Sequence, residues 1–505
     1  MSAMDELGDG ELARISTGNA GLDDVLAGGI DPERMYLFEG HPGSGKTTLA
    51  LEFLLEGVRN GEPTLYITLS ESERELRLVA KRHGWSLEGV TVFELIPAET
   101  SLDPSQELTV LQPAEMELSE TTQMIFERVE ALAPARIVID SLSELRLLAQ
   151  NPLRYRRQIL ALKHFFSGRR STVVLLDDLS SQQNDLQLHS IVHGVVMLEQ
   201  LAIDYGAQRR RLRVVKMRGI EFKGGFHDFT IRKGGLKIYP RLVAAEHHEK
   251  FEPDLVLSGN AELDTLLGGG LERGTNALLI GAAGVGKSSL ALTYAIAAAA
   301  RQERSAIFAF DEGRGTMSAR ARTLGLPLQE KIDQGLIDVQ QIDPAEMAPG
   351  EFASVVRMSV EQRGVRVVII DSLNGYLNAM PDERFLILQM HELLSYLSQR
   401  GVLTILVLAQ HGLAGPMETP LDISYLADAV LMLRYFEFDG SVRRALSVVK
   451  KRSGRHEHAI REFNLSSQGI RVGPALNGFR GIFSGTPMYD GEEAPLMALD
   501  PHEPR

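Results

Sequence analysis

Two glycine-rich segments of the chain have the spacing that binds the phosphates of a nucleotide. GHPGSGKT runs from Gly40 to Thr47 and GAAGVGKS from Gly281 to Ser288, and both fit G-x-x-x-x-G-K-[ST]. Glycines let backbone N–H groups approach the phosphates, the lysine reaches the outer phosphates, and the last hydroxyl ligates Mg²⁺. A single match could be a chance glycine-rich turn, but two matches between a strand-like and a helix-like run predict nucleotide binding. The predicted binding residues are Gly40, Gly43, Ser44, Gly45, Lys46, Thr47, Thr48, Gly281, Gly284, Val285, Gly286, Lys287, Ser288 and Ser289.

Two later apolar runs end in an aspartate. RIVID ends at Asp140 and VVIID at Asp371. A strand that delivers a carboxylate to the carboxyl edge of a parallel sheet supplies the second half of a phosphate-loop site, where it supports Mg²⁺. Either residue alone could be a turn aspartate that ends a strand. Because both follow a phosphate loop, the predicted Mg²⁺ ligands are Thr47, Asp140, Ser288 and Asp371.

Acidic residues also follow the second strand-like run of each half, in YITLSESERE and IFAFDEGRGT. Hydrolysis of a nucleotide needs a group that orients or deprotonates water in line with the γ-phosphate. We expect these runs to lie beside the phosphate-loop strands, which makes Glu71 and Glu312 the predicted catalytic residues; the family resemblance given below adds Asp311. The alternative is that such acids favour the N-terminus of the next helix, and this role is preferred for Glu73 and Glu75.

An internal repeat sets the elements that must position these residues. STGNAGLDDVLAGGI (16–30) matches LSGNAELDTLLGGGL (257–271), and Lys46 and Lys287 lie 241 positions apart, as 287 − 46 gives. Each half alternates strand-like and helical runs, which predicts an α/β fold with a mostly parallel sheet flanked by helices. We expect one domain at 1–245, a second at 246–485 and a flexible acidic tail at 486–505.

Composition limits the classes of partner. The 53 Lys and Arg against 67 Asp and Glu give a formal charge of −14, so nucleic acid binding would need a local basic patch and is not expected. The absence of cysteine excludes disulfides and Cys-ligated metals and favours the cytoplasm. The N-terminus lacks the pattern of a signal peptide, and the apolar run from Leu290 is too short for a bilayer and predicts a buried helix.

Together these residues resemble the KaiC family, the double-domain branch of RecA-like ATPases that includes the cyanobacterial circadian clock kinase. The resemblance covers nearly the whole chain and includes VVKMRG, FTI and GGLKIYP in the first half and HAIREF and FSGTP in the second. It implies tandem RecA-like P-loop domains that bind ATP and Mg²⁺, and self-assembly into a homohexamer or stacked rings. It also implies paired glutamates after the second strand, but the first half has Ser70 before Glu71, whereas Asp311 and Glu312 keep two acids.

The resemblance assigns a role in the neighbouring subunit to four basic residues: Lys216, Arg218, Lys450 and Arg452. It implies that they reach the neighbour's nucleotide, where cations neutralise charge in the transition state as arginine fingers do. Without the resemblance, alternating outward charges on a half-exposed strand would be the simpler interpretation.

The clock kinase also phosphorylates itself on an adjacent Ser-Thr pair. The matching place is Ser424-Tyr425, with Thr419 upstream, so Ser424 is the phosphorylation candidate and only one acceptor hydroxyl of the pair is kept. A hydroxyl before a strand can instead have a capping role.

The leading interpretation is an ATP-binding and ATP-hydrolysing ring protein with serine autokinase or autophosphatase activity in its second half. A signalling or timing role would bring clock or signalling adaptor proteins as partners. The alternatives are a RecA-like DNA-dependent ATPase and a nucleotide-gated signalling scaffold. Arginine runs at Arg209 to Arg211 and at Arg146, Arg154, Arg156 and Arg157 could meet nucleic acid, but the overall charge favours solvated faces or subunit contacts.

Overall fold

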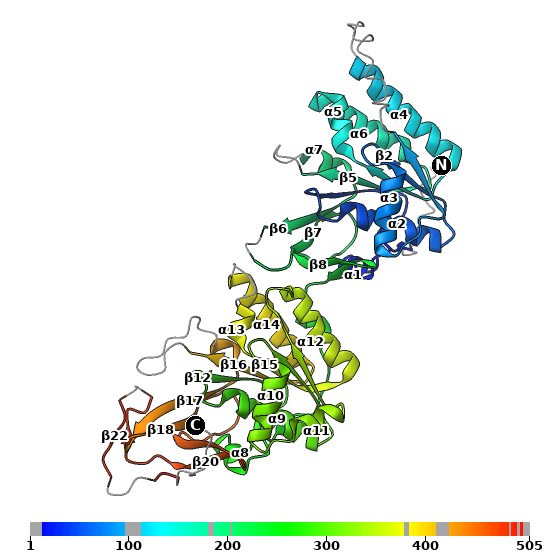
Figure 1. Cartoon of the computed structure of the whole chain (residues 1–505). Helices are drawn as coiled ribbons and strands as arrows, with labels where there is room; N and C mark the ends of the chain where they lie inside the picture. The colour runs from blue at the N-terminus through cyan, green and yellow to red at the C-terminus, as the bar shows by residue number, and fades with distance from the viewer. Residues whose placement is uncertain are drawn as a thin grey trace, which may run out of the picture. The chain divides into compact units, whose positions relative to one another are not determined.

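The computed structural model describes residues 13–95, 113–179, 186–202, 205–377, 383–410, 424–483, 486–491 and 495–497. The chain divides into two compact units, Met1–Arg241 and Leu242–Arg505, slightly before the expected join at residue 245. In Figure 1 the first unit runs from blue to green and the second from green to red.

The first unit is built on one sheet of nine strands in the order β3-β2-β4-β5-β1-β6-β7-β8-β9. The pairs from β3 across to β6 are parallel, and the pairs from β6 to β9 are antiparallel. The strands are β1 (Met35–Gly40), β2 (Thr64–Thr68), β3 (Val90–Glu94), β4 (Arg136–Asp140), β5 (Thr172–Asp178), β6 (Gly194–Leu201), β7 (Arg209–Met217), β8 (His227–Arg232) and β9 (Gly235–Tyr239). The helices are α1 (Ala20–Val25), α2 (Lys46–Arg59), α3 (Glu73–His83), α4 (Pro113–Leu132), α5 (Leu142–Ala149), α6 (Pro152–Phe166) and α7 (Leu186–Ile191).

The second unit repeats this order as β14-β13-β15-β16-β12-β17-β18-β19-β20, again parallel as far as β17 and antiparallel beyond it. Its strands are β12 (Asn276–Gly281), β13 (Arg304–Ala309), β14 (Ile337–Gln341), β15 (Val365–Asp371), β16 (Leu403–Ala409), β17 (Ala429–Phe438), β18 (Ser441–Lys451), β19 (Arg461–Ser466) and β20 (Gly469–Ala475), with the short pairs β10 (Leu255–Val256) with β11 (Leu271–Glu272) and β21 (Phe479–Arg480) with β22 (Met488–Tyr489). Its helices are η3 (Ala244–His247), α8 (Ala261–Leu266), α9 (Lys287–Ala300), α10 (Arg314–Thr323), α11 (Leu328–Asp333), α12 (Pro349–Arg363), α13 (Leu373–Leu377), α14 (Glu383–Gln399) and η4 (Ser424–Leu426). The predicted fold, tandem RecA-like α/β domains, is confirmed.

The strand order corrects one expectation about the site. β4 and β5 lie between β1 and β2, so the strand that precedes Glu71 is not beside the phosphate-loop strand. The same is true of β13 and β12 in the second unit. Consecutive strands in the chain were expected to be neighbours in the sheet. Instead, the crossovers through α2 and α9 leave room for two later strands between them. All these strands are parallel, so their carboxyl ends still meet at one edge of each sheet.

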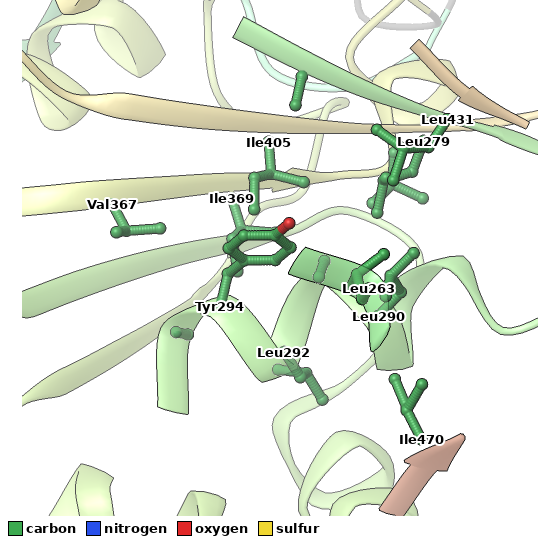
Figure 2. Close-up of a cluster of buried hydrophobic side chains, with 14 of the residues drawn as sticks. Leu263, Leu279, Leu290, Leu292, Tyr294, Val367, Ile369, Ile405, Leu431 and Ile470 are labelled. Carbon is green, nitrogen blue, oxygen red and sulfur yellow. The ribbon is translucent and has the colours of Figure 1, made fainter. Parts of the chain in front are cut away.

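The apolar run of the second unit forms a buried helix under its sheet. Figure 2 shows Leu290, Leu292 and Tyr294 of α9 packed with sheet residues that include Ile369 and Ile405, and all five are at most 1% exposed. The prediction of a buried helix from Leu290 is therefore confirmed. None of the described helices combines the length and hydropathy that a bilayer crossing requires.

The edge strands and the C-terminal segment differ from the sequence analysis. The strands β3 and β14 were not anticipated, because their half-buried residues give no continuous apolar run. Within the segment 486–505, Met488–Tyr489 forms β22, and Met497 N donates to Glu462 Oε2. Arg443 Nη1 donates to Met497 O at 2.9 Å, so these described residues of the segment pack on the second unit.

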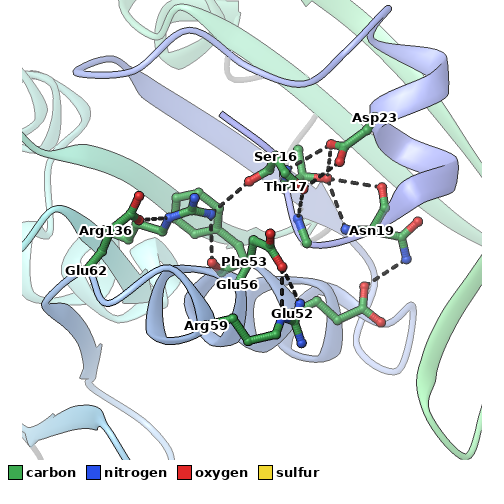
Figure 3. A network of polar contacts seen from close by, with 11 residues as sticks. Ser16, Thr17, Asn19, Asp23, Glu52, Phe53, Glu56, Arg59, Glu62 and Arg136 are labelled. Carbon is green, nitrogen blue, oxygen red and sulfur yellow. Dashed lines mark hydrogen bonds and ion pairs between the residues drawn. The ribbon is translucent and has the colours of Figure 1, made fainter. Parts of the chain in front are cut away.

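A polar network joins the N-terminal segment of the first unit to α2 (Figure 3). The Asn19 side chain caps α1, and its Nδ2 donates to Glu52 Oε2 at 2.8 Å. Leu236 N of β9 donates to Glu52 Oε1 at 2.7 Å. Nearby, the buried Arg136 guanidinium pairs with Glu62 and lies over the Phe53 ring. The network therefore connects the phosphate-loop helix to two segments that are distant in sequence.

This network predicts a pH-dependent stability of the first unit. Burial raises the pKa of Glu52 to about 7, against the opposing effect of the hydrogen bond from Asn19. A raised folded pKa means that the acid contributes fully only below its unfolded pKa, and that stability is lost as pH rises through about 7. The shift corresponds to roughly 3 kcal/mol above both pKa values.

We therefore expect Glu52→Gln to flatten the fall in the thermal midpoint of the first unit between about pH 5 and about pH 8. Differential scanning calorimetry of the full chain measures this. The second unit is an internal control, because Thr293 occupies the matching position 241 residues later, as 293 − 52 gives. Identical pH profiles for wild type and variant would contradict the prediction.

Candidate functional site

Each phosphate loop ends on a glycine that the fold requires. Gly45 and Gly286 are the N-caps of α2 and α9, with φ of 105° and 109°. A Cβ on Gly45 would lie 2.9 Å from Ile231 Cδ1, and one on Gly286 would lie 2.8 Å from Phe463 Cε1. Neither N-cap makes a side-chain capping bond, so no capping side chain occupies the first N–H groups of these helices. Both loops therefore fit an anion at a helix N-terminus.

The lysine of the first loop is buried and paired. Lys46 Nζ donates to Gly40 O at 2.8 Å and to His41 O at 3.1 Å. It also forms an ion pair of 2.6 Å with Asp178 Oδ1. Asp178 ends β5 directly beside Gly40 in the parallel register, so the neighbouring strand supplies the counter-charge.

The lysine of the second loop has the same backbone contacts but a different strand end beside it. Lys287 Nζ donates to Gly281 O at 2.9 Å and to Ala282 O at 2.6 Å. The residue in register with Gly281 on β16 is Ala409, so this strand end has no carboxylate. Burial lowers the pKa of Lys287 to about 8, although the charge of Asp371 acts in the opposite direction.

The two strand-end aspartates lie next to the hydroxyls of the phosphate loops. Asp140 Oδ2 accepts a hydrogen bond from Thr47 Oγ1 at 3.4 Å and another from the buried Tyr66 hydroxyl. Asp371 is hydrogen-bonded to Ser288. Burial raises the pKa of both aspartates. In each unit a hydroxyl and a carboxylate thus converge as the oxygen ligands that Mg²⁺ prefers.

Glu71 lies in the turn after β2 with an unsatisfied carboxylate oxygen. Its backbone is fixed by Thr68, whose Oγ1 accepts from Glu71 N at 2.9 Å and donates to Glu71 O at 2.7 Å. Among the described residues, the buried Oε2 of Glu71 has no hydrogen-bond partner. Burial raises the pKa of Glu71, and the charges of Asp140 and Glu75 act in the same direction. An unpaired buried carboxylate oxygen near a predicted Mg²⁺ ligand is suited to receive a water or hydroxyl proton.

The acids next to Glu71 have a structural role, as preferred from the sequence. Ser72 and Glu75 form a capping box at the start of α3, and Glu73 pairs with Arg77 one turn later. Ser70 is exposed.

Both acids after the second strand of the second unit have partners. Ser372 Oγ donates to Asp311 Oδ2. Arg320 binds Glu312 with two nitrogens, Nη2 to Oε2 at 2.6 Å and Nε to Oε1 at 3.2 Å. The Nη1 of the same guanidinium donates to Ser289 Oγ at 2.8 Å. The two units therefore hold their candidate catalytic acids in different charge environments.

A cavity of about 500 Å³ lies over the phosphate loop of the second unit. Most of the predicted phosphate residues of this unit and its predicted metal and catalytic residues line it, together with Leu324 after α10 and apolar residues of β16 and β19. The lining residues are Ala283, Gly284, Gly286, Lys287, Ser288, Ser289, Asp311, Glu312, Arg320, Thr323, Leu324, Asp371, Ser372, Val407, Ala409, Arg444 and Leu465. The structure thus places Lys287, Ser288, Asp311, Glu312 and Asp371 around one cavity.

The first pair of predicted neighbour-facing cations lies far from its own phosphate loop. Lys216 pairs with Val195, which pairs in turn with Leu37 of β1, roughly 10 Å along the strand from Gly40. The head groups of Lys216 and Arg218 donate to carbonyl oxygens at the end of α7, at 2.9 Å and 2.8 Å. These cations belong to the edge of the sheet opposite the carboxyl ends of the parallel strands.

The second pair repeats this placement next to the phosphorylation candidate. Lys450 Nζ donates to Ala427 O at 2.9 Å, and Arg452 Nη2 donates to Tyr425 O at 2.9 Å. Ser424 begins the short helix η4, and Tyr425 is 52% exposed. Thr419 lies outside the described residues.

Several residues of the site were missed from the sequence. Asp178 ends an apolar strand as Asp140 does, so the same pattern could have identified it. Arg320 and Tyr66 had a weaker signal, since each differs in kind from its counterpart in the other half: Val79 and Ile307, 241 positions away (320 − 79 and 307 − 66).

Two of the arginines in the arginine-rich runs are paired with acids. Arg211 Nε lies 2.8 Å from Glu199 Oε2, and Arg146 pairs with Asp177. In both pairs the acid belongs to the same unit as the arginine.

The repeated sheet, with its glycine loop, buried lysine and strand-end aspartate, defines a P-loop NTPase with two RecA-like domains. The family model for the KaiC ATPase matches residues 15–243 and 256–477, and the chain therefore belongs to the KaiC family. This family is one of P-loop ATPases, which implies that the chain binds ATP.

The similar curated proteins span the same length. "Circadian clock protein KaiC3" of Synechocystis sp. is 27% identical over 97% of this chain and 97% of its own. "Circadian clock oscillator protein KaiC" is 27% identical in Acaryochloris marina and 26% identical in Synechococcus elongatus, over 94% of this chain and 92% of each relative.

Lys287 has no carboxylate at the neighbouring strand end of β16, and this predicts that the affinity of the second site for ATP depends on pH. Because the pKa of Lys287 is about 8, the side chain is mostly neutral well above that pH. Phosphate binding then requires Lys287 to take up a proton, which weakens the affinity. We expect the affinity of the second site for a fluorescent ATP analogue to fall more steeply from about pH 8 to about pH 9.5 than at lower pH. Titrations in a Lys46→Ala chain isolate this site.

Ala409→Asp supplies the carboxylate that Lys46 has in the first unit. It raises the pKa of Lys287 and should flatten the profile, whatever it does to the absolute affinity. The first site, measured in a Lys287→Ala chain, serves as the control. An unchanged slope in Ala409→Asp would show that Lys287 does not set the pH dependence.

Proposed function

We propose that the protein is an ATP-hydrolysing ring protein of the clock-kinase type with a catalytic site in each unit and serine autokinase or autophosphatase activity in the second. The observation that carries the proposal is the convergence of loop lysine, strand-end aspartate and strand-end acid at one sheet edge, found twice. The names of the relatives connect them to circadian clocks, which supports a timing or signalling role. Adaptor proteins as partners and a cytoplasmic location are part of the same proposal.

In the first site, Lys46 and the N-terminus of α2 would bind the outer phosphates of ATP. Thr47 and Asp140 would hold Mg²⁺, which when bound neutralises charge on the phosphate oxygens. Glu71 would orient the attacking water and accept its proton. Its raised pKa makes it a better proton acceptor at neutral pH than an ordinary glutamate.

In the second site, Lys287 and the N-terminus of α9 would bind the phosphates, with Ser288 and Asp371 as the Mg²⁺ ligands. Asp311 and Glu312 would share the task that Glu71 performs alone. The two acids differ in their partners, since one accepts a hydroxyl hydrogen bond and the other an arginine fork.

Assembly of copies of the chain would complete both sites. Lys216 and Arg218 lie at the sheet edge opposite their own phosphate loop, so a nucleotide that they contact must belong to a neighbouring copy. The same holds for Lys450 and Arg452. A homohexameric ring, alone or stacked, presents each such edge to the next copy.

The candidate acceptor lies beside the second pair of cations. Ser424 begins the helical turn whose Tyr425 carbonyl oxygen binds Arg452. If that edge faces the neighbour's ATP, the Ser424 hydroxyl is brought to the same nucleotide. Transfer of the γ-phosphoryl group to Ser424 then competes with transfer to water.

Glu71→Gln should decrease phosphate release by the first site by at least about 100-fold, because the proton acceptor is removed. A Lys287→Ala chain isolates that site. A Lys46→Ala chain isolates the second site. There, Asp311→Asn and Glu312→Gln should each decrease phosphate release by a smaller factor, because one acid remains. Retained binding of an ATP analogue is the control in every variant. Equal losses at both sites would contradict this asymmetry.

Incubation with Mg-ATP should modify Ser424 in the same sample that releases phosphate. Phosphopeptide mapping locates the modified residue, and Ser424→Ala and Lys287→Ala are the controls. Phosphate release without modification of Ser424 would leave the ATPase proposal standing and exclude the autokinase.

A further inference from the structure

The second unit holds its candidate catalytic glutamate with a cation that the first unit lacks. Arg320 on α10 donates hydrogen bonds to both carboxylate oxygens of Glu312, from Nη2 at 2.6 Å and from Nε at 3.2 Å. Its Nη1 donates to Ser289 Oγ at 2.8 Å. Ser289 belongs to the first turn of the phosphate-loop helix α9. The guanidinium is therefore anchored between the phosphate loop and the glutamate.

The matching helix of the first unit shows what the site is like without this cation. Val79 stands at the position of Arg320, and its neighbours Leu76 and Ala80 are buried as their counterparts in the second unit are. Val79 packs against the apolar core. Glu71 consequently has no arginine fork, and among the described residues its buried Oε2 has no partner.

The ion pair changes what Glu312 can do for an attacking water. A bidentate guanidinium occupies a lone pair on each oxygen and fixes the plane of the carboxylate. The lone pairs that the guanidinium occupies are not available to the proton of an attacking water. The side chains are 27% and 22% exposed, so solvent screens the pair only in part.

We propose that Arg320 is a brake on the second site, a positioning residue that withholds Glu312 from water and makes this site the slower ATP hydrolase. The proposal rests on the role of Glu312 in the proposed function. The opposite role is also testable: Arg320 lines the cavity over the phosphate loop, and a cation that contacted the phosphates would accelerate hydrolysis. The sign of the change in turnover separates the two roles.

The experiment exchanges the two residues in the full chain. In a Lys46→Ala background, which reports the second site, Arg320→Val should increase kcat of phosphate release about fivefold, equivalent to about 1 kcal/mol. Arg320→Lys keeps the charge but cannot bind both carboxylate oxygens as the guanidinium does. Its kcat should lie between those of the chain with Arg320 and of Arg320→Val. In a Lys287→Ala background, Val79→Arg should lower kcat of the first site.

Two measurements make the result decisive. Affinity for an ATP analogue should stay within about twofold, because a brake that acts through Glu312 changes kcat and not binding. The acceleration should vanish in Arg320→Val combined with Glu312→Gln. An unchanged or lower kcat in Arg320→Val, or an acceleration that survives Glu312→Gln, overturns the brake.

The failure of the proposed function would look different. If phosphate release in the Lys46→Ala chain does not depend on Lys287, the second site is not an ATPase. If release depends on Lys287 and Arg320→Val does not increase it, the ATPase stands and the brake is wrong. Thermal midpoints of all variants show whether the fold is kept.

Discussion

Each unit has to hold one buried lysine ammonium at the carboxyl edge of its sheet. In both units the carbonyl oxygens of the first two loop residues bind it, at distances between 2.6 and 3.1 Å. This arrangement requires a strand that ends in glycine, a loop that turns back on itself and a helix that begins at the lysine. The residue before the lysine has a positive φ, and a Cβ there would lie within 3 Å of a side chain of β8 or β19, so the conformation and the space both favour glycine.

The scaffold is shared, but the charges around the lysine are arranged in opposite ways. In the first unit Lys46 has the partner Asp178, while the buried Oε2 of Glu71 has no hydrogen-bond partner among the described residues. In the second unit Ala409 leaves the lysine without that carboxylate, and Arg320 pairs with the glutamate. The additional charged partner thus lies beside the lysine in the first unit and beside the glutamate in the second. The two sites share a strand order but differ in their electrostatics.

The repeat made much of the fold and site predictable from sequence. The glycine loops and the apolar runs that end in Asp140 and Asp371 depend only on residues close together in sequence, so their patterns can be recognised without the structure. Strand order is not local: β4 and β5 come between β1 and β2, so chain order misplaced the strand before Glu71. The pair of Arg320 and Glu312 spans eight residues, which is more than one helical turn, and no local pattern predicts it.

The spacing between repeats explains why the counterparts of some residues were hard to see. The spacing is 241 residues for the pair Glu71 and Glu312 but 231 residues for the pair Asp140 and Asp371, as 312 − 71 and 371 − 140 give. The change in spacing arises between β2 and β4 in the first unit and between β13 and β15 in the second. Asp178 and Ala409 come after it in the chain. The two are matched by structure, since each lies in register with the glycine that begins its phosphate loop. The same place in the sheet therefore holds an aspartate in one unit and an alanine in the other. The substitutions that separate the two halves at the lysine and at the glutamate are therefore chemical differences between the sites.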